Sequence, residues 1–166
     1  GQVTGLVVPA AARANATAAP EPEALTCIDL FAGAGGLSIG LGEAGFEHLG
    51  LVERNARAAA TLERNGFANV TCADVGAVDY TRWAGKATLL AGGPPCQPFS
   101  SGGLMRGAAD ARDGWGCALD AVRAVQPRAV LFENVRGMMS PRFDTYREGI
   151  SARLNQLGYH HGWYAI

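Results

Sequence analysis

Residues 26–36 read TCIDLFAGAGG, an apolar run that stops at a cluster of glycines. Such a run predicts a buried strand at Thr26–Phe31, and the glycines predict a tight turn after it. Leu37 and Leu41 then recur at helical spacing, and Gly45 is placed to end that helix. This part of the chain predicts a strand, a glycine-rich loop and a helix in succession.

The same alternation continues along the chain. Helices are expected after Asn55, which can cap one, and after Thr145, which forms a capping-box pattern with Glu148. A weak helix or turn is expected at Asp79–Ala84, and an amphipathic helix over residues 118–125. Strands alternating with helices predict an α/β fold with a mostly parallel sheet. The further strands are expected at His48–Glu53, Val70–Asp74, Thr88–Ala91, Ala129–Glu133 and Tyr159–Ile166.

Length and composition indicate one globular domain. The chain has 166 residues, of which 48% are hydrophobic and 17% charged. Residues 1–24 are rich in Ala and Pro and are expected to form a flexible leader before a domain at residues 25–166. The formal net charge is −1, whereas proteins that bind duplex DNA usually carry a basic excess. Any binding of nucleic acid is therefore expected to depend on a local basic region or on another chain.

The cysteines indicate reduced thiols rather than a metal site. None of the four, Cys27, Cys72, Cys96 and Cys117, forms a C-x-x-C pair, so no metal centre is expected. We expect a cytoplasmic protein on this ground. The longest uncharged stretch, Ala87–Met105, is broken by prolines and glycines and is not expected to span a membrane.

Candidate site residues lie at the carboxyl ends of successive predicted strands. The carboxyl ends of parallel strands meet at one edge of a sheet, where ligands bind in such folds. We therefore expect one site built from the residues at these ends, which are Phe31, Gly33, Glu53, Asp74, the segment from Pro94 to Cys96, and Glu133.

The first half of this site favours a nucleoside. The loop Phe31–Gly36 departs from the G-x-G-x-x-G dinucleotide fingerprint because Ser38 takes the third glycine slot, so a pyrophosphate is not favoured. Glu53 suits the two hydroxyls of a ribose, and Asp74 suits an exocyclic amine. A site for a nucleoside without a phosphate-binding loop indicates S-adenosylmethionine. The alternative is a tight turn beside two solvated or capping carboxylates.

The second half favours a nucleophile. Prolines stiffen the chain on both sides of Cys96 in GGPPCQPFS, residues 92–100, and a thiolate there is a good carbon nucleophile. Glu133 ends the neighbouring predicted strand and can donate a proton to a ring nitrogen. Arg106, Arg112 and Arg136 lie in flanking loops and are candidates for phosphate contacts. The alternatives are an inert buried cysteine and solvated surface arginines.

Three blocks resemble the cytosine-5 DNA methyltransferase family. They are DLFAGAGGLSIG at residues 29–40, GGPPCQPFS at 92–100 and ENVRGMM at 133–139. The resemblance covers about residues 25–166 and implies the Rossmann-like fold of S-adenosylmethionine-dependent methyltransferases. It implies that Cys96 attacks C6 of a cytosine flipped out of duplex DNA, while Glu133 protonates N3. It also implies that S-adenosylmethionine, with S-adenosylhomocysteine as product, is held by Phe31, Gly33, Gly35, Glu53, Asp74 and Pro94.

The sequence departs from the family after its last predicted strand. It stops at Ile166, before the Gln-x-Arg-x-Arg block, the target-recognition region and the final helix of the family. We expect a split enzyme, a heterodimer whose second polypeptide carries these parts, as a DNA methyltransferase subunit of restriction-modification type. A truncated piece and a degenerate remnant remain open. So do a non-catalytic S-adenosylmethionine-binding regulatory module and an RNA cytosine-5 methyltransferase.

Overall fold

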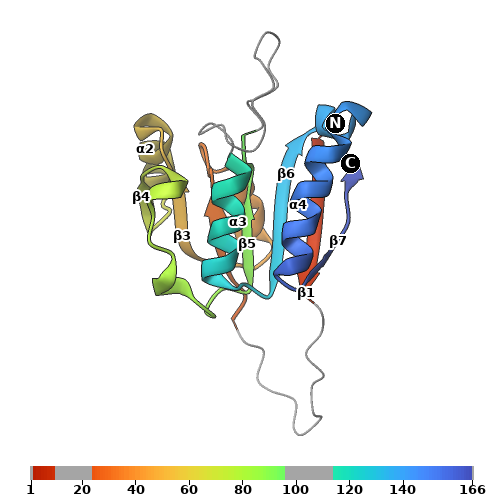
Figure 1. The fold of residues 1–166 in the computed structure, drawn as a ribbon. Coiled ribbons are helices and arrows are strands. Elements are labelled where there is room, and N and C mark those ends of the chain that lie inside the picture. The colour runs from red at the N-terminus through yellow and green to blue at the C-terminus, as the bar shows by residue number, and fades with distance from the viewer. Residues whose placement is uncertain (1, 10–23, 96–113, 166) are drawn as a thin grey trace, which may run out of the picture.

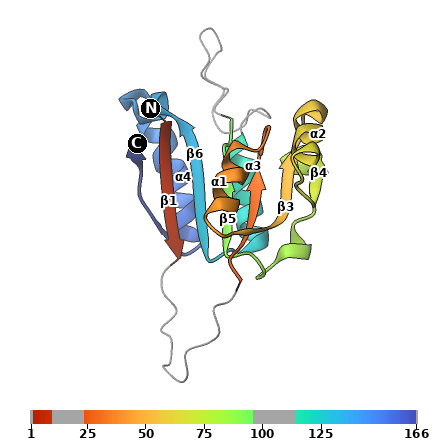
Figure 2. The ribbon, with the colours of Figure 1, turned by 180° about the vertical axis from the view of Figure 1, so that it is seen from behind.

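The computed structural model describes the main chain of residues 2–9 and, in full, residues 24–95 and 114–165. It has three layers, with one central sheet between helices (Figure 1). Helices α3 (Gly114–Val125) and α4 (Asp144–Gln156) cover one face. Helix α1 (Gly36–Glu43) lies on the opposite face (Figure 2), and α2 (Ala56–Arg64) packs beside the outer strands.

Five strands of the sheet are parallel, which confirms the predicted α/β fold. Their carboxyl ends share one edge, and the order reverses direction between β2 and β5. That reversal is where open α/β sheets bind ligands. In spatial order these strands are β4 (Val70–Cys72), β3 (Glu47–Glu53), β2 (Thr26–Leu30), β5 (Leu89–Gly92) and β6 (Ala129–Val135).

The remaining strands gather around β1 (Gln2–Pro9). This strand is antiparallel to β6, with Val3 opposite Asn134, and it also pairs with β7 (Tyr159–His161) and β8 (Tyr164–Ala165). Composition predicts a flexible leader over residues 1–24, but the structure places residues 2–9 inside the sheet. The segment QVTGLVVP is rich in β-branched residues, and the ladders on both sides pair its main chain. The division of the chain at residue 24 remains a prediction.

The sequence signals at the helix ends predicted one helix start correctly and another wrongly. Asn55 caps α2 as predicted, because its side-chain oxygen accepts from the amides of Arg57 (3.0 Å) and Ala58 (3.3 Å). The capping box at Thr145 is wrong. A short 3₁₀ turn, η6 (Pro141–Phe143), leads directly into α4 at Asp144, so Thr145 already lies within the first helical turn. The weak helix or turn expected at residues 79–84 is a 3₁₀ turn, η2 (Thr81–Trp83).

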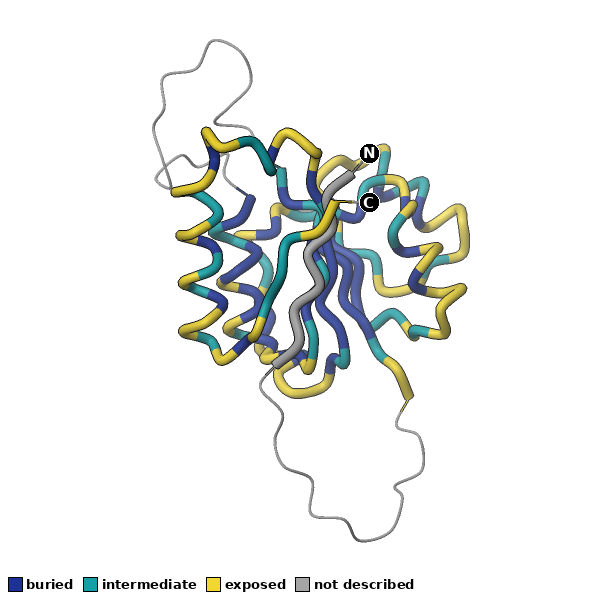
Figure 3. Tube along the Cα trace, turned by 90° about the vertical axis from the view of Figure 1, so that its right-hand side faces the viewer, coloured by how far each residue is buried: buried dark blue, intermediate teal, exposed yellow. Residues whose placement is uncertain are grey.

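The main core lies between the sheet and the α3–α4 layer. Figure 3 shows the central strands buried along their length, whereas the helices expose their outer sides. The indole of Trp83 fills the space above Gly50, where an added Cβ would come within 2.3 Å of the ring. The largest fully buried side chains of this core include Ile28, Leu30, Leu90, Val122 and Val130. Among the described residues, no helix is long and apolar enough to cross a bilayer.

Candidate active site

The loop after β2 adopts a backbone that few residues tolerate. Phe31 and Gly33 both have φ +56°, and Gly35 has φ +100°. A left-handed conformation costs a residue with a side chain roughly 1–2 kcal/mol. Phe31 therefore carries local strain beside the strand reversal, a feature that concentrates at functional sites. Because an added Cβ on Gly33 would meet nothing within 4 Å, the main chain there borders open space.

Glu53 fastens this loop to the end of β3. One carboxylate oxygen accepts from the amide of Gly33 at 2.8 Å, and the other accepts from the amide of Asn55 at 2.6 Å. The residue is 8% exposed, so its carboxylate is held in one orientation. Each oxygen keeps further acceptor capacity, because an ionised carboxylate has about four lone-pair sites. Glu53 is thus preorganised to accept from two neighbouring hydroxyl groups.

Asp29, a site residue that sequence reasoning missed, lies buried under the same loop. Its Oδ2 accepts from the hydroxyl of Ser38 at 2.5 Å, while Oδ1 is buried and has no partner among the described residues. Burial, with the nearby negative charge of Glu53, raises the pKa of Asp29 to about 6 despite that hydrogen bond. A buried acceptor without a donor costs about 1–3 kcal/mol, so this oxygen destabilises the described structure. The available signal was a lone acid in the apolar run TCIDLF.

Asp74 follows β4 but is already engaged. Its side-chain oxygen accepts from the amide of Gly76 at 2.9 Å and caps a 3₁₀ turn, η1 (Val75–Ala77). The guanidinium of Arg54 lies 3.8 Å from its other oxygen, and both side chains are mostly exposed. The structure therefore realises the capping alternative for this carboxylate. A contact of Asp74 with an amine stays a prediction.

The turn that leads to Cys96 is fastened to the end of β6. The side-chain amide of Asn134 donates to the carbonyl of Pro94 at 2.8 Å in a buried hydrogen bond. An added Cβ on Gly93 would come within 3.2 Å of Oε2 of Glu133, so this carboxylate lies against the turn. Pro95 is the last described residue before Cys96. The approach of Cys96 to Glu133 therefore stays a prediction.

The predicted arginines divide between described and undescribed parts. Arg136 is exposed directly after β6 at the carboxyl edge. Arg106, Arg112 and Cys96 lie outside the described residues. Within residues 24–95 and 114–165, no group of three His, Cys, Asp or Glu side chains is placed to hold a metal ion.

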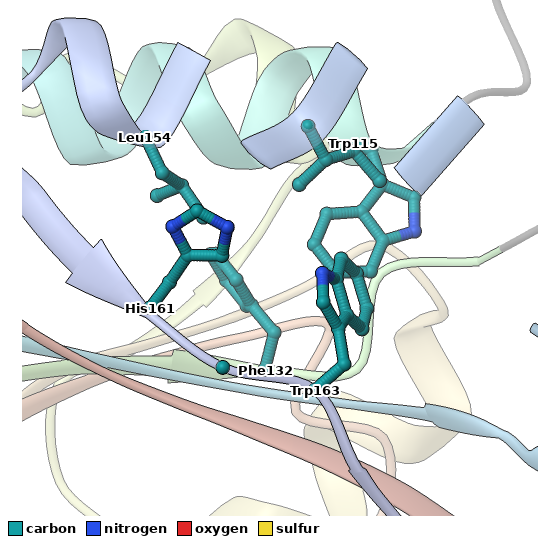
Figure 4. A pocket seen from close by; sticks show the side chains of 7 residues that line it. Trp115, Phe132, Leu154, His161 and Trp163 are labelled. Atoms are coloured by element: carbon teal, nitrogen blue, oxygen red, sulfur yellow. The ribbon is translucent and has the colours of Figure 1, made fainter. Parts of the chain in front are cut away.

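Trp115 at the start of α3 meets Phe132 edge-on, with ring centroids 5.2 Å apart, and its centroid lies 5.8 Å from that of Trp163 (Figure 4). Phe132 precedes Glu133, and alternation along β6 sends the two side chains to opposite faces. The three aromatic rings line a hollow together with Ile150, Leu154, His161 and Gly162, and this lining is almost wholly apolar. The hollow therefore belongs to the scaffold, whereas the polar groups described above form the site.

The described groups suit S-adenosylmethionine. A ribose can donate to Glu53, and S-adenosylmethionine carries a ribose and no phosphate, which agrees with the absence of a pyrophosphate-binding pattern in Phe31–Gly36.

Comparison with known proteins identifies the family. The family model for C-5 cytosine-specific DNA methylase matches residues 25–165. The chain is 41% identical over 145 residues to Type II methyltransferase M.NaeI of Lentzea aerocolonigenes, covering 85% of this chain and 35% of that protein. It is 40% identical over 139 residues to Type II methyltransferase M.NgoMIV of Neisseria gonorrhoeae, covering 83% and 44% respectively. The chain thus spans less than half the length of these relatives.

A solved structure shows the same fold. The crystal structure of a Spodoptera frugiperda DNMT2 mutant superposes with a TM-score of 0.63 at 20% identity, over 80% of this chain and 41% of that one. The crystal structure of a putative DNA modification methyltransferase encoded within a prophage (E. coli) superposes with a TM-score of 0.63 at 27% identity, over 80% of this chain and 38% of that one, which confirms the predicted Rossmann-like methyltransferase fold. The chain belongs to the C-5 cytosine-specific DNA methylase family.

Proposed function

We propose that this chain is the cofactor-binding and catalytic part of a DNA cytosine-5 methyltransferase. The observation that carries the proposal is the hydrogen bond from Asn134 to Pro94, which ties the turn before Cys96 to the strand end of Glu133. A thiol and a carboxyl group that act on one pyrimidine must be held at a fixed separation. This buried link, together with family membership, supports that arrangement.

The cofactor lies at the β2–β3 side of the edge in this proposal. S-adenosylmethionine supplies an electrophilic methyl group when bound, and S-adenosylhomocysteine is the product. Glu53 accepts from the ribose hydroxyls. Phe31 lies against the adenine. The main chain at Gly33, Gly35 and Pro94 lines the site, and Asp74 borders the adenine amine.

The chemistry lies with Cys96 and Glu133. The thiolate of Cys96 adds to C6 of the flipped cytosine, while Glu133 holds a proton at N3 and makes the ring more electrophilic. The electron pair released at C5 would form the new bond to the methyl group as the bond from the methyl group to sulfur breaks, with the pair of that bond left on sulfur. A base then removes the C5 proton, and the returning electron pair expels the thiolate. Glu133 takes back the proton from N3, so both side chains are regenerated with one methyl group transferred.

Recognition of DNA is proposed to come from a second polypeptide. The net charge of −1 supplies little neutralisation of phosphates, and affinity for duplex DNA depends largely on that neutralisation. Arg136, with Arg106 and Arg112, supplies local phosphate contacts. A role in restriction-modification follows by analogy with the type II relatives.

A covalent-trapping experiment tests the proposal. The chain is coexpressed with the polypeptide that carries target recognition and is mixed with S-adenosylmethionine and duplex DNA containing 5-fluorocytosine. Fluorine at C5 cannot leave as a proton does, so the adduct persists through denaturing electrophoresis. We expect the adduct with wild type and with the control Cys72→Ala, because Cys72 is an exposed thiol on β4. Cys96→Ala should give none.

Three outcomes count against parts of this proposal. Methyl transfer by Cys96→Ala at the wild-type rate overturns the nucleophile. Methylation of transfer RNA but not of duplex DNA in a parallel assay overturns the substrate. Binding of S-adenosylmethionine with no methylation in any combination favours the non-catalytic module.

A further inference from the structure

The segment after the catalytic strand turns sharply before it enters α4. Strand β6 ends at Val135, and the chain then forms two short 3₁₀ turns, η5 (Arg136–Met139) and η6 (Pro141–Phe143). Within the segment, the amide of Ser140 donates to Gly137 at 3.0 Å and the amide of Phe143 donates to Ser140 at 2.9 Å. Short turns of this kind open easily unless other groups fix their carbonyls.

Arg147 of α4 supplies that fixation. Its Nη1 donates to the carbonyl of Met138 at 2.5 Å and to the carbonyl of Ser140 at 3.2 Å. Its Nη2 pairs with the carboxylate of Asp144. The Arg147 side chain is only 17% exposed, so its two contacts with main-chain carbonyls are partly shielded from water, whereas Asp144 is exposed. A planar guanidinium presents its donors in a rigid fork, and here the fork joins three acceptors in one geometry.

Arg153 lies on the same helix but has a different task. Its guanidinium reaches Asp120 on α3 at 3.0 Å, and its side chain is 42% exposed. It donates to no carbonyl of the 136–140 turn in the described structure. The two arginines therefore form a matched pair for experiment. One holds the turn, and the other links two helices.

The turn is also anchored from the core side. Met138 is fully buried, whereas Arg136, two residues earlier, is exposed at the carboxyl edge of the sheet. The anchored side chain and the held carbonyls restrict the main chain after Gly137, and the pairing of Val135 with Gln2 of β1 fixes the chain before Arg136. The exposed arginine is consequently presented from a fixed support. A preorganised cation loses less conformational entropy when it meets a phosphate.

We propose that Arg147 is a positioning residue, which holds the 136–140 turn so that Arg136 meets the phosphate backbone of the substrate. The inference rests on the proposed DNA methyltransferase function. It predicts that Arg147 affects the affinity for DNA and leaves the affinity for S-adenosylmethionine unchanged, because the proposed cofactor residues lie on β3 and in the loops after β2, β4 and β5, and none lies in the 136–140 turn.

Hydrogen exchange of the 166-residue chain tests the structural half. In Arg147→Ala, the amides of Ser140 and Phe143 should exchange about tenfold faster or more, because charge-assisted hydrogen bonds are lost. Arg147→Lys keeps a cation but not the forked guanidinium, so its exchange rates should lie between those of wild type and Arg147→Ala. Arg153→Ala should leave both amides unchanged. Equal exchange rates in wild type and Arg147→Ala overturn the inference.

Kinetics and DNA binding test the functional half, using the preparation described for covalent trapping. Arg147→Ala should raise KM for DNA about tenfold at nearly constant kcat, and Arg136→Ala should do the same. The double variant should be no worse than either single variant, because both act through one contact. A fully additive double variant, or a fall in kcat alone, overturns the inference. If wild type binds duplex DNA without methylating it, only the proposed function fails, because DNA affinity still reports on Arg147.

Discussion

Replacement of Asp29 by Asn should remove a pH-dependent cost from the stability of the fold. Asp29 is fully buried, accepts one hydrogen bond from Ser38 and leaves one oxygen unpartnered. Asn has nearly the same shape and keeps an oxygen for the Ser38 hydroxyl, but it cannot ionise. The two side chains therefore differ chiefly in the charge that wild type must bury above its pKa.

The magnitude follows from the shift in pKa. The pKa of Asp29 rises from 3.8 to about 6 in the folded chain, mainly through burial. Each unit corresponds to about 1.4 kcal/mol, so the full effect is about 3 kcal/mol. Because the pKa of Asp29 is higher in the folded chain than in the unfolded chain, its contribution to the free energy of unfolding is fully present below about pH 4, where the side chain is protonated in both states. That contribution is lost as the pH rises through about 6.

The assay is urea-induced unfolding of wild type and Asp29→Asn at a series of pH values from 4 to 8. The difference in the free energy of unfolding should shift in favour of the variant by about 3 kcal/mol across this range. Asp79→Asn is the control of opposite sign. The hydroxyl and amide of Thr81 donate to Asp79 and lower its pKa, so that carboxylate stabilises the fold above its ordinary pKa. A difference between wild type and Asp29→Asn that does not change with pH would refute the reasoning.

Four further predictions use other parts of the structure. Asn134→Ala should cost about 1–3 kcal/mol in urea unfolding, because it leaves a buried carbonyl of the Gly-Gly-Pro-Pro turn without its donor. Gly92→Ala should cost about 1–3 kcal/mol by the same measurement, because its Cβ would lie 2.5 Å from a main-chain oxygen of β2. Gly116→Ala, inside α3 with nothing within 4 Å, should instead stabilise by about 0.5–1 kcal/mol. Alkylation followed by peptide mass spectrometry should label exposed Cys72 quickly and spare Cys27, because burial and the charge of Asp29 raise the pKa of the Cys27 thiol to about 12; equal labelling rates would contradict this.

The strand, loop and helix over residues 26–45 could be predicted because their signals are local. An apolar run, a glycine cluster and a helical repeat each act over a few residues. The parallel order of the sheet then placed Glu53, Asp74, Pro94 and Glu133 at one edge. The same local reasoning failed at Thr145, where the geometry of a preceding 3₁₀ turn, rather than a side-chain cap, starts the helix.

Other features depend on partners that are distant in the sequence. Strand β1 pairs with β6, more than a hundred residues away, so nothing near Gln2–Pro9 reveals its neighbours. The acceptors of Arg147 include main-chain carbonyls, which every residue possesses and no motif marks. The value of Asp29 as a site residue depends on its burial and on the hydroxyl of Ser38.

The amino-acid order alone specified which chemical groups follow each parallel strand, and hence the family of the chain. Which of those groups are free to meet a ligand was decided only when the chain folded. Glu53 is held by two amides with acceptor capacity left, Asp74 is occupied as a cap, and Asp29 is left with an unpaired oxygen. The reason is that a strand end fixes where a side chain starts, whereas burial and hydrogen bonds from other segments fix its charge and its remaining capacity to bind.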